Sequence, residues 1–206
     1  RCGGRCIFAG AVGDDAFGAV ILERLKADGV DTSLIAVAPG IATGSAFVSY
    51  NDDGSRDFVF NITHSAAARF DGSAPVIGAL LAFKLDYFHV SGTALSNESM
   101  CAATLQVCSA LHEAGVKFSF DPNVRKELMG NAGYLAAVDE IMSLTSIFLP
   151  SEDDAAALFP GKSFAEFATP LLAAHMDYVV LKKGDHGCEA MDKTGQRLRL
   201  PSHKVE

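Results

Sequence analysis

Val116-Lys117-Phe118-Ser119-Phe120-Asp121-Pro122-Asn123-Val124-Arg125 is the stretch around which the sequence is organised. It begins as a short apolar run of the kind that forms a buried strand, and a proline ends the run. A carboxylate, an amide and a guanidinium then follow at two-residue spacing, in Asp121, Asn123 and Arg125. Ligands of open α/β sheets bind where strands end, so these side chains are candidate ligand contacts. The alternative is a plain turn followed by a solvated arginine.

The composition excludes several functional classes. The chain has 206 residues, 49% of them hydrophobic, which suits one domain with a small additional segment. The formal net charge of −8 disfavours nucleic-acid and membrane-surface partners, because both need a basic face. No apolar run reaches the length of a membrane span, and no signal peptide is visible. The five cysteines lack zinc-ribbon spacing and are interpreted as reduced core thiols of a cytoplasmic protein.

Strand and helix patterns alternate along most of the chain. Strands are expected at residues 6–9, 86–90, 116–121, 146–149 and 178–181, with helices at residues 16–28, 97–114, 134–144 and 164–174. The helix at 16–28 has Phe17, Val20, Ile21 and Leu25 on one face. The helix at 97–114 is expected to turn Met100, Ala103, Val107 and Leu111 inward. Residues 43–50 and 55–62 are β-rich and flank the turn sequence Asn51-Asp52-Asp53-Gly54, which predicts a hairpin. Residues 189–200 predict a second hairpin.

Repeated strand–helix–strand units place the carboxyl ends of parallel strands along one edge of a sheet. The most polar and glycine-rich segments of the sequence follow these strands and are expected to meet at that edge. They are residues 10–13, 91–92, 121–125, 151–154 and 182–187. The clustering predicts a ligand site at the edge.

Each of these segments has two interpretations. The glycines at 10, 13 and 18 do not match a dinucleotide-binding spacing, so residues 10–18 are either a ligand loop or a structural turn. Ser151 and Asp154 either order water on Mg²⁺ beside a triphosphate or form an ordinary acidic helix start. Lys182 and Gly184 suit a nucleotide phosphate but also an exposed loop. No metal-spaced histidine pair and no serine-hydrolase motif occur in the sequence.

Taken together, the motifs resemble the ribokinase-like (PfkB-type) carbohydrate kinases over essentially the whole chain. The matching pieces are Gly10-Ala-Val-Gly-Asp-Asp-Ala-Phe-Gly18, Gly29-Val-Asp-Thr32, Thr43-Gly44, Asp121-Pro-Asn-Val-Arg125, Leu149-Pro-Ser-Glu152 and Leu181-Lys-Lys-Gly184. Within the family, Asp121-Pro-Asn-Val-Arg125 and Pro150-Ser-Glu152 are most similar to the 2-keto-3-deoxygluconate kinase branch. Ile62 stands where that branch carries a lid arginine, which is a departure from its pattern.

The resemblance implies an α/β fold of three α/β/α layers, with a mainly parallel sheet and a small β lid. The core would comprise residues 1–38 and 67–206, incomplete at both ends, and the lid residues 39–66. The implied activity is transfer of the γ-phosphate of ATP to a hydroxyl of a sugar or sugar acid, with Mg²⁺, in a homodimer joined through the lid. A nucleoside kinase and a non-catalytic sugar- or nucleotide-binding module on the same scaffold are the alternatives.

The resemblance also assigns roles to residues. Asn123, Arg125, Phe60 and Asn61 would bind the sugar. Ser151, Asp154, Lys182 and Gly184 would serve the nucleotide and its phosphates, with Asp154 acting on Mg²⁺ through water. The family's Gly-Ala-Gly-Asp motif, which carries the general base, is expected beyond Glu206, so no catalytic base is assigned and the 206 residues alone are expected to be inactive.

Overall fold

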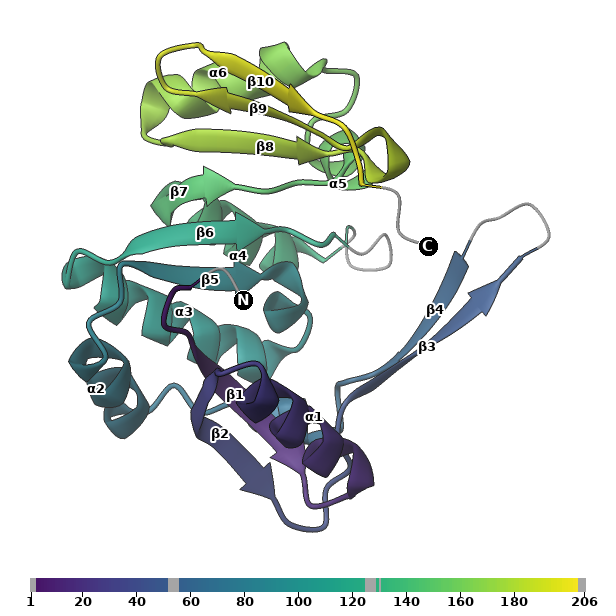
Figure 1. The fold of residues 1–206 in the computed structure, drawn as a ribbon, viewed down its shortest axis with the longest axis vertical. Helices are drawn as coiled ribbons and strands as arrows, with labels where there is room; N and C mark the ends of the chain where they lie inside the picture. The colour runs from purple at the N-terminus through teal and green to yellow at the C-terminus, as the bar shows by residue number, and fades with distance from the viewer. Residues whose placement is uncertain (1–2, 52–55, 125–128, 130, 204–206) are drawn as a thin grey trace. The chain divides into compact units, whose positions relative to one another are not determined.

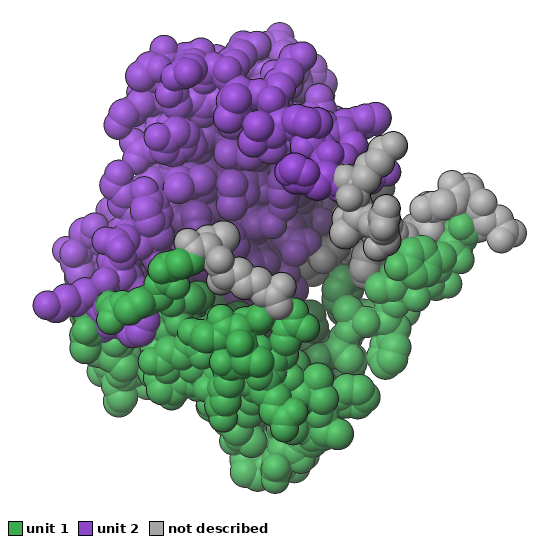
Figure 2. Space-filling view, in the orientation of Figure 1, with its two compact units in different colours: residues 1–82, 97–107 green, residues 83–96, 108–206 purple. Residues whose placement is uncertain are grey.

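The computed structural model describes residues 3–51, 56–124, 129 and 131–203 (Figure 1). The chain divides into two compact units, residues 1–82 with 97–107 and residues 83–96 with 108–206 (Figure 2). The division between them falls within helix α3 (Glu98–Glu113). Among the described helices, none combines the length and the apolar character that crossing a membrane requires.

A six-stranded sheet in the order β10-β9-β8-β7-β6-β5 forms the centre of the second unit. Its parallel part is β5 (Tyr87–Ser91), β6 (Lys117–Asp121), β7 (Thr145–Phe148) and β8 (Tyr178–Lys182). The connections contain α3, α4 (Ala132–Leu144), α5 (Glu152–Leu158) and α6 (Phe164–Ala174). β9 (Cys188–Asp192) and β10 (Arg197–Leu200) add the antiparallel hairpin. These elements confirm the predicted parallel α/β units and the second hairpin.

Alternate residues of the parallel strands build the core of this unit. Phe118, Phe120 and Phe148 have no exposed surface. Phe148 also contacts the ring of Phe159, which stacks on Phe167 of α6 at 4.8 Å between ring centroids, so aromatic rings connect the sheet to its helices. Side chains with the other parity, such as Tyr87 and Tyr178, remain 43% and 48% exposed. The alternation is that of strands with one buried face.

The predicted inward face of α3 is confirmed for three of its four residues. Met100, Val107 and Leu111 are buried, and Ala103 is half-buried. The spacing of the three buried residues, seven and four, places them on one side of a helix with 3.6 residues per turn. The helix ends at Glu113 and Gly115 follows with a φ of 81°, a conformation that favours glycine.

The first unit holds two separate two-stranded sheets. β1 (Ile7–Gly13) and β2 (Asp31–Ala38) are parallel and are joined by α1 (Ala16–Ala27). β3 (Ser45–Tyr50) and β4 (Arg56–Asn61) form the predicted hairpin, whose turn residues 52–55 lie outside the described part. The short helix η1 (Ala66–Arg69) and α2 (Ala74–Ala82) follow.

The contacts of the segment Gly10–Gly18 are those expected of a structural turn. Residues 10–13 continue β1, in register with β2 up to Gly13 opposite Ala38, where the sequence predicted a loop. The Asp15 carboxylate accepts from the Gly18 amide at 2.8 Å and so caps α1. It also accepts from the Thr43 amide and hydroxyl, each at 2.7 Å. Residues 10–13 therefore belong to the β1–β2 sheet of the first unit and are not part of the six-stranded sheet.

The apolar face of α1 is not the face on which the helix packs. The helix meets β1 through Gly18, where an added Cβ would lie 2.2 Å from the Gly13 carbonyl oxygen. At 100° per residue, Leu25 points within about 20° of Gly18 and is half-buried, whereas Phe17 and Val20 point about 100° and 160° away. Both remain largely exposed, at 73% and 63%. Close packing on a glycine, which an apolar count overlooks, sets the orientation of this helix.

Candidate active site

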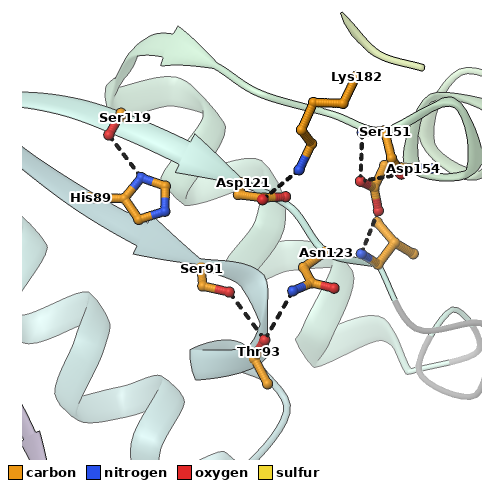
Figure 3. A network of polar contacts seen from close by, with 10 residues as sticks. His89, Ser91, Thr93, Ser119, Asp121, Asn123, Ser151, Asp154 and Lys182 are labelled. Carbon is orange, nitrogen blue, oxygen red and sulfur yellow. Dashed lines mark hydrogen bonds and ion pairs between the residues drawn. The ribbon is translucent and has the colours of Figure 1, made fainter. Parts of the chain in front are cut away.

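A pocket of about 190 Å³ lies at the carboxyl ends of the parallel strands in the second unit (Figure 3). β7 ends at Phe148, but its chain continues to bond to both neighbours. The Leu149 amide donates to the Phe120 carbonyl at 2.8 Å, and the Lys182 amide donates to the Pro150 carbonyl at 2.8 Å. The pocket is lined by Asp121, Asn123, Val124, Ser151, Asp153, Asp154 and Lys182. Four of the residues predicted for the site, Asn123, Ser151, Asp154 and Lys182, therefore come together.

An ion pair crosses this edge of the sheet. Lys182 Nζ donates to Asp121 Oδ2 at 2.5 Å, although β7 lies between their strands. The two side chains are 42% and 26% exposed, so the pair lies at the rim of the pocket (Figure 3).

Asn123 is held by its backbone and by the neighbouring loop. Its φ of 42° lies in the left-handed region, which asparagine tolerates better than most residues. The side-chain amide donates to Thr93 Oγ1 at 3.4 Å, and Thr93 Oγ1 is 3.1 Å from Ser91 Oγ. Thr93 belongs to the short helix η2 (Gly92–Leu95) that follows β5. The ends of two adjacent strands therefore fix the orientation of the Asn123 amide.

Glycine is required beside Asn123. A Cβ added at Gly92 would lie 1.7 Å from the Pro122 carbonyl oxygen. This is far inside van der Waals contact, so the chain after β6 could not pass η2 at its present distance if residue 92 had a side chain. The close approach lets Asn123 reach Thr93.

Ser151 and Asp154 form a capping box at the start of α5, which confirms the predicted N-cap. The Asp154 carboxylate accepts from the Ser151 amide and hydroxyl at 2.8 and 2.7 Å. Its other oxygen accepts from the Val124 amide at 2.6 Å. Asp154 is 4% exposed. This buried carboxylate therefore joins α5 to the segment that carries Asn123.

The remaining predicted residues lie elsewhere or outside the described part. Gly184 begins the short helix η4 (Gly184–His186) after β8, with a φ of 54°. Phe60 and Asn61 are consecutive residues of β4 in the first unit, so their side chains leave opposite faces of the hairpin. At most one of the two can point toward a given ligand. Arg125 lies outside the described residues.

Sequence reasoning missed the partners of the site residues. Asp121 opened the sequence argument, but its ion pair with Lys182 joins residues 61 positions apart. His89 Nδ1 lies 2.9 Å from Ser119 Oγ on the same face of the sheet (Figure 3). Partial burial lowers the pKa of His89, and the nearby Asp121 carboxylate opposes that shift. The polar residues at alternate positions of residues 87–91 and 117–121 were the available signal.

The whole chain, residues 1–206, matches the family model described as pfkB family carbohydrate kinase. The chain belongs to this family. Among curated proteins it is 30% identical to fructokinase-1 of Zea mays, over 100% of the chain and 64% of that protein. It is 29% identical to a fructokinase of Vibrio alginolyticus, over 91% of the chain and 60% of that protein.

Solved structures confirm the ribokinase-like α/β fold. An E. coli protein provisionally named ribokinase II superposes in its apo form with a TM-score of 0.87 at 32% identity, over 99% of the chain and 65% of that protein. The same protein in complex with ATP and Mg²⁺ superposes with a TM-score of 0.86, over 99% and 64%. The pfkB family chain thus spans about half to two thirds of the length of the relatives it matches.

The relatives do not support the finer assignment to the 2-keto-3-deoxygluconate kinase branch. The curated proteins above are named fructokinases. The branch assignment rested on Asp121–Arg125 and Pro150–Glu152, and Ile62 already departed from it.

Proposed function

We propose that the protein containing this chain is an ATP-dependent sugar kinase. The observation that carries the proposal is the pocket at the carboxyl edge of β6, β7 and β8, in a chain of the pfkB family. It gathers an ammonium, an amide, a hydroxyl and carboxylates, from Lys182, Asn123, Ser151, Asp121 and Asp154. Phosphoryl transfer depends mainly on positioning and on stabilising charge, and this set of groups can do both.

Within this proposal the residues divide between the two substrates. Lys182 and Gly184 approach the nucleotide phosphates, the first by its charge and the second by its exposed backbone. Asn123 offers a donor and an acceptor to a sugar hydroxyl, and Arg125 is assigned beside it. Residues 39–66 are proposed as a lid over the sugar, contributing Phe60 or Asn61.

The residues of the pocket fit Mg²⁺ bound together with phosphates. Among the described residues there is no group of three or more side chains that could hold a metal ion by itself. Mg²⁺ usually keeps several waters and takes one or two carboxylates plus substrate phosphates. Asp154 accepts three hydrogen bonds, which leaves one acceptor position of its carboxylate for such a water. When bound, the ion would neutralise phosphate charge.

A ketohexose such as fructose is the proposed sugar, because the named relatives are fructokinases. 2-Keto-3-deoxygluconate and nucleosides are the other acceptors to test. A sugar- or nucleotide-binding module without transfer activity is the alternative to a kinase. An assay of ADP production distinguishes these possibilities, with the full-length protein, ATP, Mg²⁺ and each acceptor in turn. Turnover with a sugar supports the proposal; binding of sugar and ATP without ADP formation would establish the binding module.

Asn123 offers a sharper test of the site within the same assay. Asn123→Gly keeps the left-handed backbone accessible and removes only the amide. We expect the KM for the sugar to rise about fivefold, the size of one lost hydrogen bond, with the KM for ATP unchanged. A variant whose sugar KM equals that of the wild type would exclude Asn123 from sugar binding.

A homodimer joined through the β3–β4 hairpin is part of the proposal. The hairpin exposes apolar side chains on both faces, Phe47 and Val59 on one, Val48, Tyr50 and Phe60 on the other. Phe47→Ser is expected to lower the apparent mass in sedimentation, whereas the exposed Phe17→Ser on α1 is not.

The four described cysteines are free thiols, which supports the proposed cytoplasmic location.

A further inference from the structure

Two ion pairs connect β6 and β8 across the ends of β7. At the amino ends, Lys117 Nζ lies 2.8 Å from Asp177 Oδ2. At the carboxyl ends, Lys182 Nζ lies 2.5 Å from Asp121 Oδ2. β6 thus begins with a cation and ends with an anion, whereas β8 is preceded by an anion and ends with a cation. The amino-end pair is a structural counterpart against which the pair at the pocket can be compared.

The two pairs differ in how completely their carboxylates are satisfied. Asp177 receives a second ammonium, Lys193 Nζ at 2.8 Å from Oδ1, so both of its oxygens are bonded. Asp121 Oδ1 is shielded from solvent and has no hydrogen-bond partner in the described part of the chain. A shielded carboxylate oxygen without a partner is unfavourable. The carboxyl-end pair is therefore the less stabilising of the two.

The charges around the pocket explain why the weaker Asp121–Lys182 pair matters for ligand binding. Its seven lining residues include three carboxylates, Asp121, Asp153 and Asp154, and one ammonium, Lys182. Among the described lining residues, the Lys182 ammonium is the cation that can attract an anionic ligand, and Asp121 already neutralises it. The Lys182 side chain is 42% exposed, so its flexible stem can move.

We propose that Asp121 is a positioning residue acting through Lys182: it holds the ammonium at the pocket, and a phosphate-bearing ligand binds by taking the ammonium from Asp121. The inference rests on the proposed function, which places nucleotide phosphates beside Lys182. Asp121 thereby sets the strength of phosphate binding without touching the phosphate. Partly exposed ion pairs are weak, so the exchange changes affinity by a small factor.

The test is a double-mutant cycle on the full-length protein, with Kd measured by calorimetry for Mg²⁺-ATP and for inorganic tripolyphosphate. Asp121→Asn removes the competitor of the phosphate and is expected to lower both Kd values about two- to fivefold. Lys182→Met is expected to raise them. In the Lys182→Met background, Asp121→Asn should lose most of its effect, because the two side chains act as a unit.

Two control variants separate the exchange from other effects. Asp153→Asn removes a carboxylate of the same pocket that makes no ion pair with Lys182 in the described structure, and so measures simple charge repulsion. Asp177→Asn breaks the amino-end pair, and so measures the effect of losing an ion pair across β7. The second control is expected to lower the melting temperature and to leave both Kd values unchanged.

Three results would overturn the inference. The first is an Asp121→Asn variant that melts earlier but binds both anions like the wild type or more weakly. The second is a gain in anion affinity of Asp121→Asn that equals the gain of Asp153→Asn and that persists in the Lys182→Met background. The third is a wild-type protein that binds neither anion. If the protein phosphorylates a sugar but the effects of Asp121→Asn and Lys182→Met on Kd are additive, only the inference about Asp121 is refuted. If the two effects are coupled for tripolyphosphate but no sugar is phosphorylated, only the proposed kinase activity is refuted.

Discussion

The Asp154 carboxylate accepts hydrogen bonds from two different segments, the start of α5 and the chain after β6. Two of these bonds come from Ser151 and complete the capping box. The third comes from the Val124 amide, next to Asn123. A change at Asp154 therefore alters both a helix start and the position of Asn123, and a loss of activity in such a variant would not by itself identify a ligand contact.

Gly92 offers a cleaner change near the pocket. Gly92→Ala places a Cβ 1.7 Å from the Pro122 carbonyl oxygen, so we expect a loss of more than about 2 kcal/mol in the free energy of unfolding. Gly78→Ala in α2, where nothing lies within 4 Å of the new Cβ, should instead stabilise by about 0.5–1 kcal/mol. Urea unfolding of both variants measures the difference, and equal stabilities would contradict the close approach at Gly92.

The cysteines predict a graded reactivity. Burial raises the pKa of the Cys108 thiol to about 12, so at pH 8 only ~10⁻⁴ of it is thiolate, the reactive form. Cys6 is exposed, which corrects the expectation that all five are core thiols. With a thiol reagent we expect Cys6 to react in the native protein and Cys108 only on unfolding. The denaturant-dependent labelling should decrease by one thiol in Cys108→Ala, the partly buried Cys101 and Cys188 accounting for the remainder; rapid native labelling of Cys108 would show that the helix opens.

At the residue scale, local chemistry was predictable and long-range partners were not. The Ser151 cap could be recognised because a capping box lies within four consecutive residues. The bond from Asn123 to Thr93 spans 30 positions and that from Lys182 to Asp121 spans 61. Both depend on the order of strands in the sheet, which a single sequence does not encode locally.

The Asp177 carboxylate, just before β8, bonds to two lysines from other parts of the sheet. Lys117 begins β6, and Lys193 lies in the turn between β9 and β10. Hydrogen bonds from Lys117 and Lys193 hold the pKa of Asp177 at about 2, below its ordinary value of 3.8. A lowered folded-state pKa stabilises the fold above the unfolded value, and this stabilisation is lost as the pH falls through the folded value. The window of loss therefore runs from about pH 4 to pH 2.

Asp177→Asn tests this window. Because Lys117 and Lys193 are largely exposed, we expect the variant to be less stable on the order of 1 kcal/mol at pH 7. The difference should shrink between pH 4 and pH 2, as measured by urea unfolding across that range. Lys117→Met should move the loss to higher pH, since one of the two hydrogen bonds is removed. A difference as large at pH 2 as at pH 7 would contradict the assignment.

The start of α1 depends on the Asp15 carboxylate. Its carboxylate caps the helix and binds Thr43, 28 residues away. We expect Asp15→Ala to lower the free energy of unfolding by about 1–2 kcal/mol, the upper part of the range for a lost N-cap. Asp14→Ala, one residue earlier and exposed, should change it by less than about 0.5 kcal/mol. Thermal unfolding of the two variants provides the comparison.

At the element scale, periodicity located the helices well and oriented them less well. The inward face of α3 was predicted because its apolar stripe is also its packing face. In α1 the apolar stripe and the packing face differ, because the helix approaches β1 at Gly18. The strand β1 was predicted too short since glycine and alanine at 10–13 do not have the pattern of a strand, although the pairing with β2 includes them.

For the whole molecule, the excess of 25 acidic over 17 basic residues is the most general property. It predicts no binding to duplex DNA at 0.1 M salt, because counterion release requires a basic surface. Fluorescence anisotropy with a labelled duplex measures this, with a basic DNA-binding domain as positive control. Salt-dependent binding in the micromolar range would contradict the charge argument.

The fold class was predictable at this scale, whereas the division into sheets was not. Alternation of strands and helices predicted parallel α/β units, and β5 to β8 have that arrangement. Residues 10–13 were expected to follow a strand of the same sheet, but in the described structure β1 and β2 form a sheet of their own. The division into a core and a lid at residues 39–66 remains a prediction, supported by the independent β3–β4 hairpin.

The two ion pairs across β7 also bear on how the sheet assembles. β6 and β8 share no backbone hydrogen bonds, and β7 bonds to β8 through only two residue pairs in its ladder. A two-residue slip of β8 would keep its apolar side chains facing inward, so burial alone corrects such an error poorly. The same slip would separate Lys117 from Asp177 and Asp121 from Lys182 at once. The two ion pairs therefore disfavour folding intermediates in which β8 is misaligned, although β6 and β8 share no backbone hydrogen bonds.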